Sequence, residues 1–314
     1  MELYNKIING CTASKADLMT LTDYDLDALC TFADKIRKHF MGNSFDICTI
    51  INGKSGKCSE DCKYCAQSAH YSTDCPEYPL LPTDKIETYA QYNASKGIAH
   101  FSVVTSGKKL TKDEINSLCS TYGKINKECN IKLCASHGLL DYESLKAIKN
   151  AGVTRYHNNL ETSEKYFKNI CTTHSPQDKI RTIKAAQEAG LEVCSGGIMG
   201  LGETMEDRID MALQLQKLNV TSVPINILNP IKNTPLEHNK ILPYNEIKRI
   251  IAIYRFALPD KFIKLAGGRG LLPDKGKSLF LCGANGAISG DMLTTAGITI
   301  DEDKKMLSSI GYKL

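Results

Sequence analysis

The sequence predicts an α/β protein folded as one closed (β/α)8 barrel of the TIM type, preceded by an N-terminal helical cap. Short β-branched or apolar runs alternate with longer amphipathic stretches, which is typical of parallel strands joined by helices. Eight such units follow one another in about 265 residues, the number that closes a barrel. No linker or low-complexity segment interrupts them, so we expect one domain, with residues 1–42 as the cap and 43–314 as the barrel.

Each element has a local justification. The cap ends in an amphipathic helix expected over residues 22–39, after a Thr-Asp start. The expected strands are 47–51, 100–105, 131–135, 154–160, 191–196, 222–228, 262–266 and 285–289. The expected helices between them are 83–95, 112–127, 142–150, 176–189, 205–218 and 245–256. Gly97, Gly152 and Gly190 each precede a strand, where a left-handed residue commonly ends a helix.

The composition is that of a globular enzyme and excludes a disordered or coiled chain. Of 314 residues, 42% are hydrophobic and 24% charged, and the formal charge is +4 with no run of like charge, so we predict no nucleic-acid partner. The first residues carry neither an export nor a transit pattern, and no apolar run approaches the ~20 residues of a membrane helix. We therefore expect a soluble cytoplasmic protein with no membrane partner.

Cysteine is over-represented, with 13 residues. An odd number without an export signal argues against a disulfide framework, because the cytosol keeps thiols reduced. Cys30, Cys48, Cys119 and Cys129 occupy helix-like or strand-like apolar positions, and we expect them to pack as small hydrophobic side chains. The clustered cysteines need another explanation.

Cys58, Cys62 and Cys65 lie in a glycine-rich polar loop directly after the first expected strand. Their CxxxCxxC spacing matches neither the paired CxxC units of zinc sites nor the CxxCxxC run of ferredoxins. Three thiolates so close together indicate a 4Fe-4S cluster with one iron left open for a chelating small molecule. Exposed free thiols without a metal would be a liability.

The triplet has the form of the radical S-adenosylmethionine signature, and residues 52–70 closely resemble the biotin synthase family. Further blocks resemble that family in its own order, at 155–163, 193–204, 224–226, 234–236 and 293–295. The resemblance implies a sulfurtransferase that inserts sulfur into dethiobiotin to form the thiophane ring of biotin. It also implies S-adenosylmethionine at the open iron, a flavodoxin- or ferredoxin-type reductant and a homodimer.

The same resemblance implies how S-adenosylmethionine is held. Asn159 and Glu161 would bind its ribose hydroxyls, with Tyr64 and Ile198 near its adenine. The family more often has Asp at the position of Glu161, and Glu keeps the acceptor while lengthening its reach. The glycine-rich run 196–202 permits close backbone approach to a nucleotide, although its spacing is not that of a dinucleotide site.

Dethiobiotin would be held at both of its ends. The resemblance implies that Asn159 and Asn226 meet the ureido ring, whose donors and carbonyl suit an amide, and that Thr294 and Thr295 meet the carboxylate. The alternative is that these are ordinary loop asparagines and an N-capping threonine pair.

The largest departure from the family concerns an auxiliary 2Fe-2S cluster, which the family holds inside the barrel with three Cys and one Arg. The second and third cysteines are present as Cys134 and Cys194, whereas Ser102 stands at the first cysteine position. Lys264 stands at the Arg position, and it is a point cation without the planar fork of Arg. We expect Lys264 to offset cluster charge or to meet substrate, rather than to form a structural ion pair.

Two thiolates would hold a sulfur-donating cluster poorly, so a third is expected. Cys171, in the loop after the fourth strand, is the favoured candidate, with Cys75 and Cys282 as weaker ones. We expect an auxiliary cluster bound by Cys134, Cys171 and Cys194, with four irons favoured over the usual two. Nearby His174 is either a loop donor or without a role.

Two other classes of function stay open. Related barrels that mature hydrogenase clusters or rearrange carbon skeletons share the CxxxCxxC loop and a ribose-binding carboxylate. Asn226, the Thr294 and Thr295 pair and the interior cysteines favour dethiobiotin over those substrates. The second class is a non-catalytic iron-sulfur carrier, which would not cleave S-adenosylmethionine under reducing conditions.

Overall fold

The structure is a computed structural model that describes residues 2–290, 292–293 and 297–313. Its strands are β1 Asp46–Lys54, β2 His100–Thr105, β3 Lys132–Ser136, β4 Val153–His157, β5 Glu192–Cys194, β6 Gly197–Met199, β7 Ser222–Ile227, β8 Phe262–Leu265 and β9 Gly286–Ile288. Their order in the sheet is β5-β4-β3-β2-β1-β9-β8-β7-β6, all pairings between these strands are parallel, and β5 also pairs with β7. Because β5 and β6 share one strand position, interrupted at Ser195 and Gly196, the described strands close the predicted eight-membered barrel.

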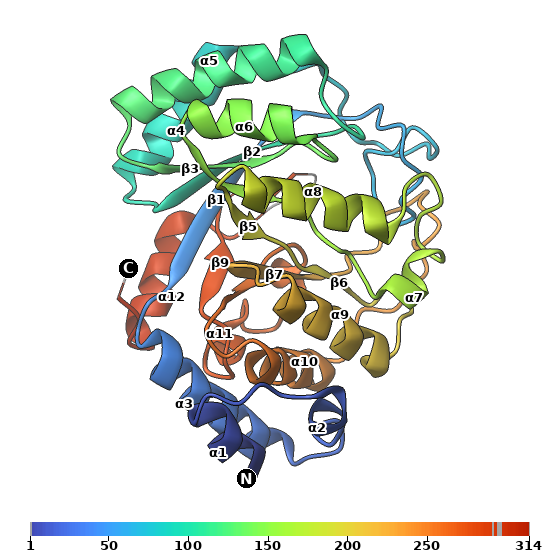
Figure 1. The fold of residues 1–314 in the computed structure, drawn as a ribbon, viewed down its shortest axis with the longest axis vertical. Coiled ribbons are helices and arrows are strands. Elements are labelled where there is room, and N and C mark those ends of the chain that lie inside the picture. The colour runs from blue at the N-terminus through green and yellow to red at the C-terminus, as the bar shows by residue number, and fades with distance from the viewer. Residues whose placement is uncertain (1, 291, 294–296, 314) are drawn as a thin grey trace.

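Amphipathic helices cover the outside of the barrel (Figure 1). They are α4 Thr83–Ser95, α5 Lys112–Glu128, α6 Tyr142–Asn150, α8 Pro176–Glu188, α9 Met205–Lys217 and α10 Tyr244–Ala257. The six predicted ranges agree with these bounds to within one residue. Capping boxes explain part of the agreement, because Thr111, Ser175 and Thr204 each accept a hydrogen bond from the backbone N–H three residues later.

Several short helices were not predicted. They are α1 Glu2–Ile8, α2 Lys15–Met19, α7 Glu164–Phe167, α11 Lys277–Phe280, α12 Ile300–Ser309 and the single-turn 3-10 helix η1 Arg269–Leu271. Their short length gives little periodicity to detect. Among the described residues, no helix has the length and apolar character needed to cross a membrane.

The N-terminal helices pack at one end of the barrel, where α3 Leu26–Met41 lies along α10 (Figure 1). The helix begins at Leu26, later than predicted, because the Asp25 side chain accepts from the Ala28 N–H at 2.8 Å. A disulfide joins Cys30 of α3 to Cys282, which follows α11. The prediction that Cys30 only packs as a small hydrophobic side chain is therefore wrong. Cys282, a weaker candidate for a cluster ligand, is used in this pair instead, because chain folding brings the two Cα atoms to 4.3 Å.

The pleat of the strands divides each into two faces. On β1, Ile47 and Ile51 pack in the hydrophobic core, whereas Cys48 and Ile50 line a central cavity. Core residues from Leu3 to Tyr312 form one continuous hydrophobic cluster. The strands thus enclose a cavity of mixed polar and apolar lining inside an apolar shell.

Candidate active site

A cavity of about 410 Å³ lies inside the barrel and reaches the loops at the C-terminal ends of the strands. It is lined by most of the residues that the sequence singled out. These are Cys58, Tyr64, Cys65, Cys134, Asn159, Glu161, Cys194, Ile198, Asn226 and Lys264. Residues of all the described strands, β1 to β9, and of several loops that follow them therefore converge on one chamber.

The three-cysteine loop is held by its own backbone. The Cys58 N–H donates to the Gln67 carbonyl at 2.9 Å, and the Cys58 carbonyl accepts from the Ala69 N–H at 2.8 Å. Burial raises the pKa of Cys65 to about 11, so the thiolate form requires a positive partner. Three thiols on one ordered loop fit the protein ligands of a 4Fe-4S cluster, because iron binding deprotonates coordinating thiols.

Glu161 faces this loop across the cavity from the segment that follows β4. Its backbone is left-handed, with φ of 72°, and its carbonyl accepts from the Ile198 N–H at 2.8 Å. Its carboxylate accepts from Asn159 Nδ2 at 3.3 Å and lies 3.9 Å from Lys179 Nζ. Burial and the adjacent Glu161 raise the pKa of Tyr64, which keeps the phenol as a neutral donor.

Close backbone packing sustains this wall. A Cβ atom at Gly196 would lie 1.9 Å from the Pro224 carbonyl oxygen, and one at Gly197 would lie 2.5 Å from the Glu161 carbonyl oxygen. Neither position accepts a larger residue without moving a strand.

The side-chain amides of Asn159 and Asn226, predicted to meet substrate, already make hydrogen bonds to backbone groups. Asn159 Oδ1 accepts from the Gly196 N–H at 3.0 Å. Asn226 Oδ1 accepts from the Gly267 N–H at 2.9 Å, and its Nδ2 donates to the Gly197 carbonyl at 3.1 Å. Each amide thus braces two walls of the cavity while lining it. Thr294 and Thr295, predicted at the substrate carboxylate, lie outside the described residues.

Three thiols converge deep in the barrel, on alternate strands β1, β3 and β5. Cys48, Cys134 and Cys194 are all buried and all line the cavity. A hydrogen bond from Cys134 lowers the pKa of Cys48, while Cys134 itself has a raised pKa. Burial raises the pKa of Cys194, but the hydrogen bond from His157 and the charges of His157, Lys264 and Arg155 together outweigh it and bring the pKa to about 7.

A buried charge cluster lies next to these thiols. Asp46 Oδ2 is 2.7 Å from Arg155 Nη1 and 2.9 Å from Lys264 Nζ, and Asp46 Oδ1 is 2.9 Å from His100 Nδ1. Burial opposes ionisation of Asp46, yet the charge of Lys264 and the other partners hold its pKa well below its usual range. Arg155 and Lys264 carry two positive charges and Asp46 carries one negative charge, so a net positive charge remains beside the thiols. Lys264 thus forms the structural ion pair that we had not favoured, and it also lines the cavity.

Comparisons with known proteins agree with this geometry. The Radical SAM superfamily model matches residues 54–215, and the Biotin and Thiamin Synthesis associated domain matches 224–313. The chain is 58% identical over 309 residues to a biotin synthase of Clostridium botulinum strain Hall, covering 98% of this chain and 97% of that one. It is 54% identical over 312 residues to a biotin synthase of Akkermansia muciniphila, with coverage of 99% and 97%.

The chain belongs to the biotin synthase family. The predicted resemblance and the radical enzyme class are confirmed.

Solved structures agree on the fold of this biotin synthase family member. A methylornithine synthase matches with a TM-score of 0.86 at 20% identity, covering 99% of this chain and 96% of that chain. A maturase of the [FeFe]-hydrogenase matches with a TM-score of 0.84 at 17% identity, with coverage of 99% and 74%. These likenesses concern the barrel alone. The alternative functions drawn from such barrels are not favoured, because the full-length sequence relatives are biotin synthases.

The structure does not bring Cys171 to the barrel thiols of this biotin synthase. Its Sγ lies 3.8 Å from Cys62 Sγ, because the segment after α7 runs back over the radical loop, where Lys63 N–H donates to the Ile170 carbonyl. Cys75 also lies apart from the barrel thiols, 3.6 Å from Ser55 Oγ. The third thiol beside Cys134 is Cys48, which we had expected to be a packing residue.

A sequence signal for Cys48 existed in the alternation of β1. Cys48 and Ile50 are two residues apart, so their side chains point to the same face of β1. Ile50 pairs in register with Ser102 of β2, the position where the family has its first cysteine. The neighbouring strand therefore places a thiol in the cavity one inward-facing position before the residue that pairs with Ser102.

Proposed function

We propose that this biotin synthase draws the sulfur of the thiophane ring from an auxiliary iron-sulfur cluster bound by Cys48, Cys134 and Cys194. The observation that carries the proposal is the convergence of these buried thiols on the cavity that Cys58, Cys65 and other residues of the radical loop also line. Dethiobiotin is the substrate that fits between the two thiol sets.

The donor chemistry supports such a cluster. Thiolates are the usual protein ligands of iron-sulfur clusters, and Lys264 and Arg155 offset the negative charge that these ligands would carry. The Lys264 ammonium is directed to Asp46 at 2.9 Å and does not offer the planar donor of the family's Arg. Three thiolates without that Arg favour a nuclearity other than 2Fe-2S, and we propose four irons.

When bound, the radical-loop cluster supplies an electron and a chelation site for S-adenosylmethionine, and the auxiliary cluster supplies sulfur. The side chains of this chain bind and orient the reactants. Glu161 accepts hydrogen bonds from the ribose hydroxyls, with Tyr64 and Ile198 beside the adenine. Asn226 offers the remaining hydrogen-bonding capacity of its amide to the ureido ring.

The apolar part of the lining excludes water from the reacting atoms. Ile50, Val104 and Ile288 come from three adjacent strands and line the cavity between the two thiol sets. Beyond the chain itself, we propose a flavodoxin- or ferredoxin-type reductant and a homodimer, as in the family, with no nucleic-acid or membrane partner.

The test is anaerobic reconstitution with S-adenosylmethionine, a reductant and dethiobiotin, followed by mass spectrometry of 5′-deoxyadenosine and biotin and by iron and sulfide analysis. The wild type should form both products. Cys48→Ala should lose the auxiliary iron and biotin while still forming deoxyadenosine, and Cys119→Ala, on the outer helix α5, is the matched control. Unchanged iron and biotin in Cys48→Ala would refute the ligand set.

A further inference from the structure

A second group of metal-ligating side chains lies outside the barrel cavity, on the outer side of the radical loop. Cys62, Cys171 and His174 each offer one ligand atom, and all of these atoms lie within 4.8 Å of one another. We propose that in the cluster-free chain these three side chains bind one divalent transition-metal ion of the Zn²⁺ or Fe²⁺ type. Because Cys62 also belongs to the CxxxCxxC triplet, the ion and the 4Fe-4S cluster exclude each other.

The spacing of the ligand atoms matches a tetrahedral ion. Zinc bonds of about 2.3 Å to sulfur and about 2.0–2.1 Å to nitrogen give edges of about 3.8 Å between two sulfurs and about 3.5 Å between sulfur and nitrogen. Cys62 Sγ and Cys171 Sγ are 3.8 Å apart, and Cys171 Sγ is 3.8 Å from His174 Nε2. Asp61 Oδ1 lies 3.2 Å from Cys171 Sγ but accepts from the Thr172 N–H at 2.8 Å, so the fourth position of the ion is left to water.

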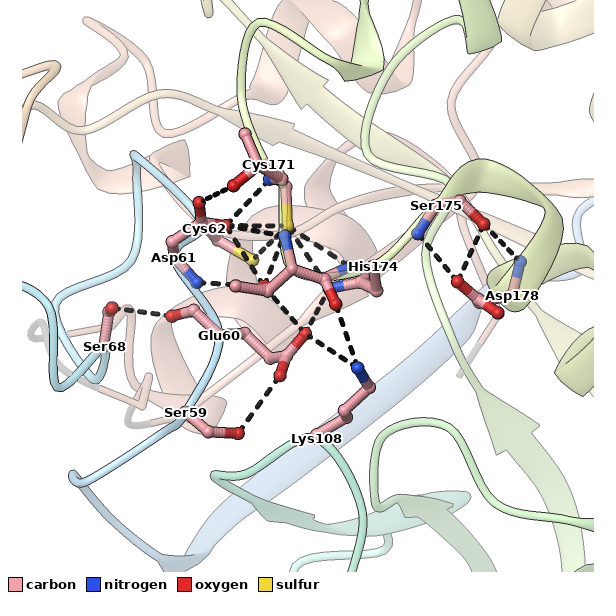
Figure 2. A network of polar contacts seen from close by, with 12 residues as sticks. Ser59, Glu60, Asp61, Cys62, Ser68, Lys108, Cys171, His174, Ser175 and Asp178 are labelled. Carbon is pink, nitrogen blue, oxygen red and sulfur yellow. Dashed lines mark hydrogen bonds and ion pairs between the residues drawn. The ribbon is translucent and has the colours of Figure 1, made fainter.

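The carboxylate behind His174 argues for a metal ligand rather than a loop donor. Glu60 Oε2 lies 2.6 Å from His174 Nδ1, and the two side chains are 8% and 5% exposed. A histidine that binds a metal through one ring nitrogen almost always donates its other N–H to a carboxylate or carbonyl. Figure 2 shows the Glu60 carboxylate, the His174 ring and the Cys171 thiol in contact. Cys171 Sγ lies 3.2 Å from Nδ1 and 3.8 Å from Nε2, and because Glu60 occupies Nδ1, Nε2 is the nitrogen that would bind the ion.

The surrounding contacts brace this geometry. Thr173 Oγ1 donates to Glu60 at 2.9 Å, and the Thr172 N–H donates to Asp61 at 2.8 Å. Lys108 Nζ lies 3.8 Å from Glu60 (Figure 2). Its charge offsets the negative charge that the Glu60 carboxylate and the two thiolates would place around a divalent ion. Two thiolates with an imidazole favour Zn²⁺, Fe²⁺ or Co²⁺ over Mg²⁺ or Ca²⁺.

Occupation of this site has a structural consequence. The ion would tie the radical loop to the segment 171–174 and withdraw Cys62 from the triplet. Cluster insertion then requires the ion to leave, so this site would control the loading of the radical cluster without taking part in sulfur insertion.

The direct test is a titration of the cluster-free full-length chain with Co²⁺ under anaerobic conditions. Wild type should develop the thiolate-to-cobalt charge-transfer band and the intense visible bands of a tetrahedral ion. Cys171→Ala and His174→Ala should lose or weaken these bands, while Cys58→Ala retains them. If the ion binds the CxxxCxxC triplet instead, Cys58→Ala loses the bands and Cys171→Ala keeps them, which would overturn the proposal.

Glu60 supplies a graded second test. Glu60→Gln should weaken Co²⁺ binding by about 10–100-fold, the usual effect of removing a carboxylate behind a metal-bound histidine. Equal affinity in Glu60→Gln and wild type would contradict the orientation of His174. The barrel thiols give the same background in every variant, so the differences between variants report this site alone.

A competition experiment tests the exclusion. Loading wild type with one equivalent of Zn²⁺ should reduce the iron incorporated during later reconstitution, and the loss should disappear in Cys171→Ala. An equal loss in both proteins would refute exclusion through this site. The readout is metal content, so it is independent of whether the loaded enzyme forms biotin.

Discussion

The two sets of thiols proposed to bind clusters differ in how the chain builds them. Cys58, Cys62 and Cys65 lie within one loop, and covalent connectivity alone keeps them together. Cys48, Cys134 and Cys194 come from β1, β3 and β5, and only the closed sheet makes them neighbours. The loop set is readable from spacing, whereas the strand set depends on register. The contrast teaches that ligands on strands are less tied to sequence position than ligands in one loop: in the proposed ligand set, one thiol comes from the strand next to the one that carries Ser102.

The largest expected effect comes from moving the third barrel thiol. Cys48→Ser should abolish biotin formation, and adding Ser102→Cys should restore part of the auxiliary iron, because Ser102 faces the same cavity from β2. Iron and sulfide analysis with biotin quantification measures both steps. A double variant no better than Cys48→Ser would show that the two strands are not interchangeable.

A change in the buried charge cluster beside Cys48, Cys134 and Cys194 is expected to have a smaller effect, and this effect is on the stability of the fold. Asp46→Asn leaves Lys264 and Arg155 without their shared carboxylate and should lower the free energy of unfolding by about 3–5 kcal/mol. Urea denaturation measures this loss. The control Asp260→Asn removes an exposed pair with Lys261 and should cost no more than about 1 kcal/mol.

The same carboxylate has a pH signature. Its folded pKa is depressed, so its stabilisation is complete above the unfolded value near 4 and is lost as the pH falls towards the folded value. Wild type should therefore lose stability more steeply than Asp46→Asn on acidification below about pH 4. Parallel acid titrations of the two proteins would contradict the buried ion cluster.

A smaller effect is expected from reducing the one pair of cysteines that forms a disulfide in the described residues. Reduction of the Cys30–Cys282 disulfide should lower the free energy of unfolding by about 2–4 kcal/mol, because it removes a cross-link between distant parts of the chain. Denaturation with and without dithiothreitol measures it. In the Cys30→Ala and Cys282→Ala double variant the reductant should have no effect. A persistent effect there would assign the loss to another thiol pair.

The smallest effect is expected from a change at Glu161, the residue proposed to bind the ribose of S-adenosylmethionine. Glu161→Asp introduces the residue more usual in the family and keeps the carboxylate acceptor, so the KM for S-adenosylmethionine should change by less than about tenfold. Deoxyadenosine formation at varied S-adenosylmethionine measures it. Glu161→Gln is the sharper comparison, since it keeps the length and removes the charge. If Glu161→Asp raises the KM more than Glu161→Gln does, the length of the side chain matters more than its charge.

The sequence by itself determined the barrel, the bounds of the six helices α4, α5, α6, α8, α9 and α10, and the radical loop. Hydrophobic periodicity and capping residues act within a few positions along the chain, which is why α4 and α6 have the bounds that the sequence predicts. The CxxxCxxC triplet is equally local. The inward face of β1 was also accessible in principle, through the shared parity of Cys48 and Ile50.

Only the tertiary structure decided which distant cysteines meet. Cys48 lies with the barrel thiols, Cys171 meets Cys62, and Cys282 pairs with Cys30. Each pairing depends on barrel closure, strand register or the path of a loop. These are set by the packing of the whole chain, so spacing in the sequence does not show which cysteines meet, even where, as for Cys48, alternation indicates the inward face.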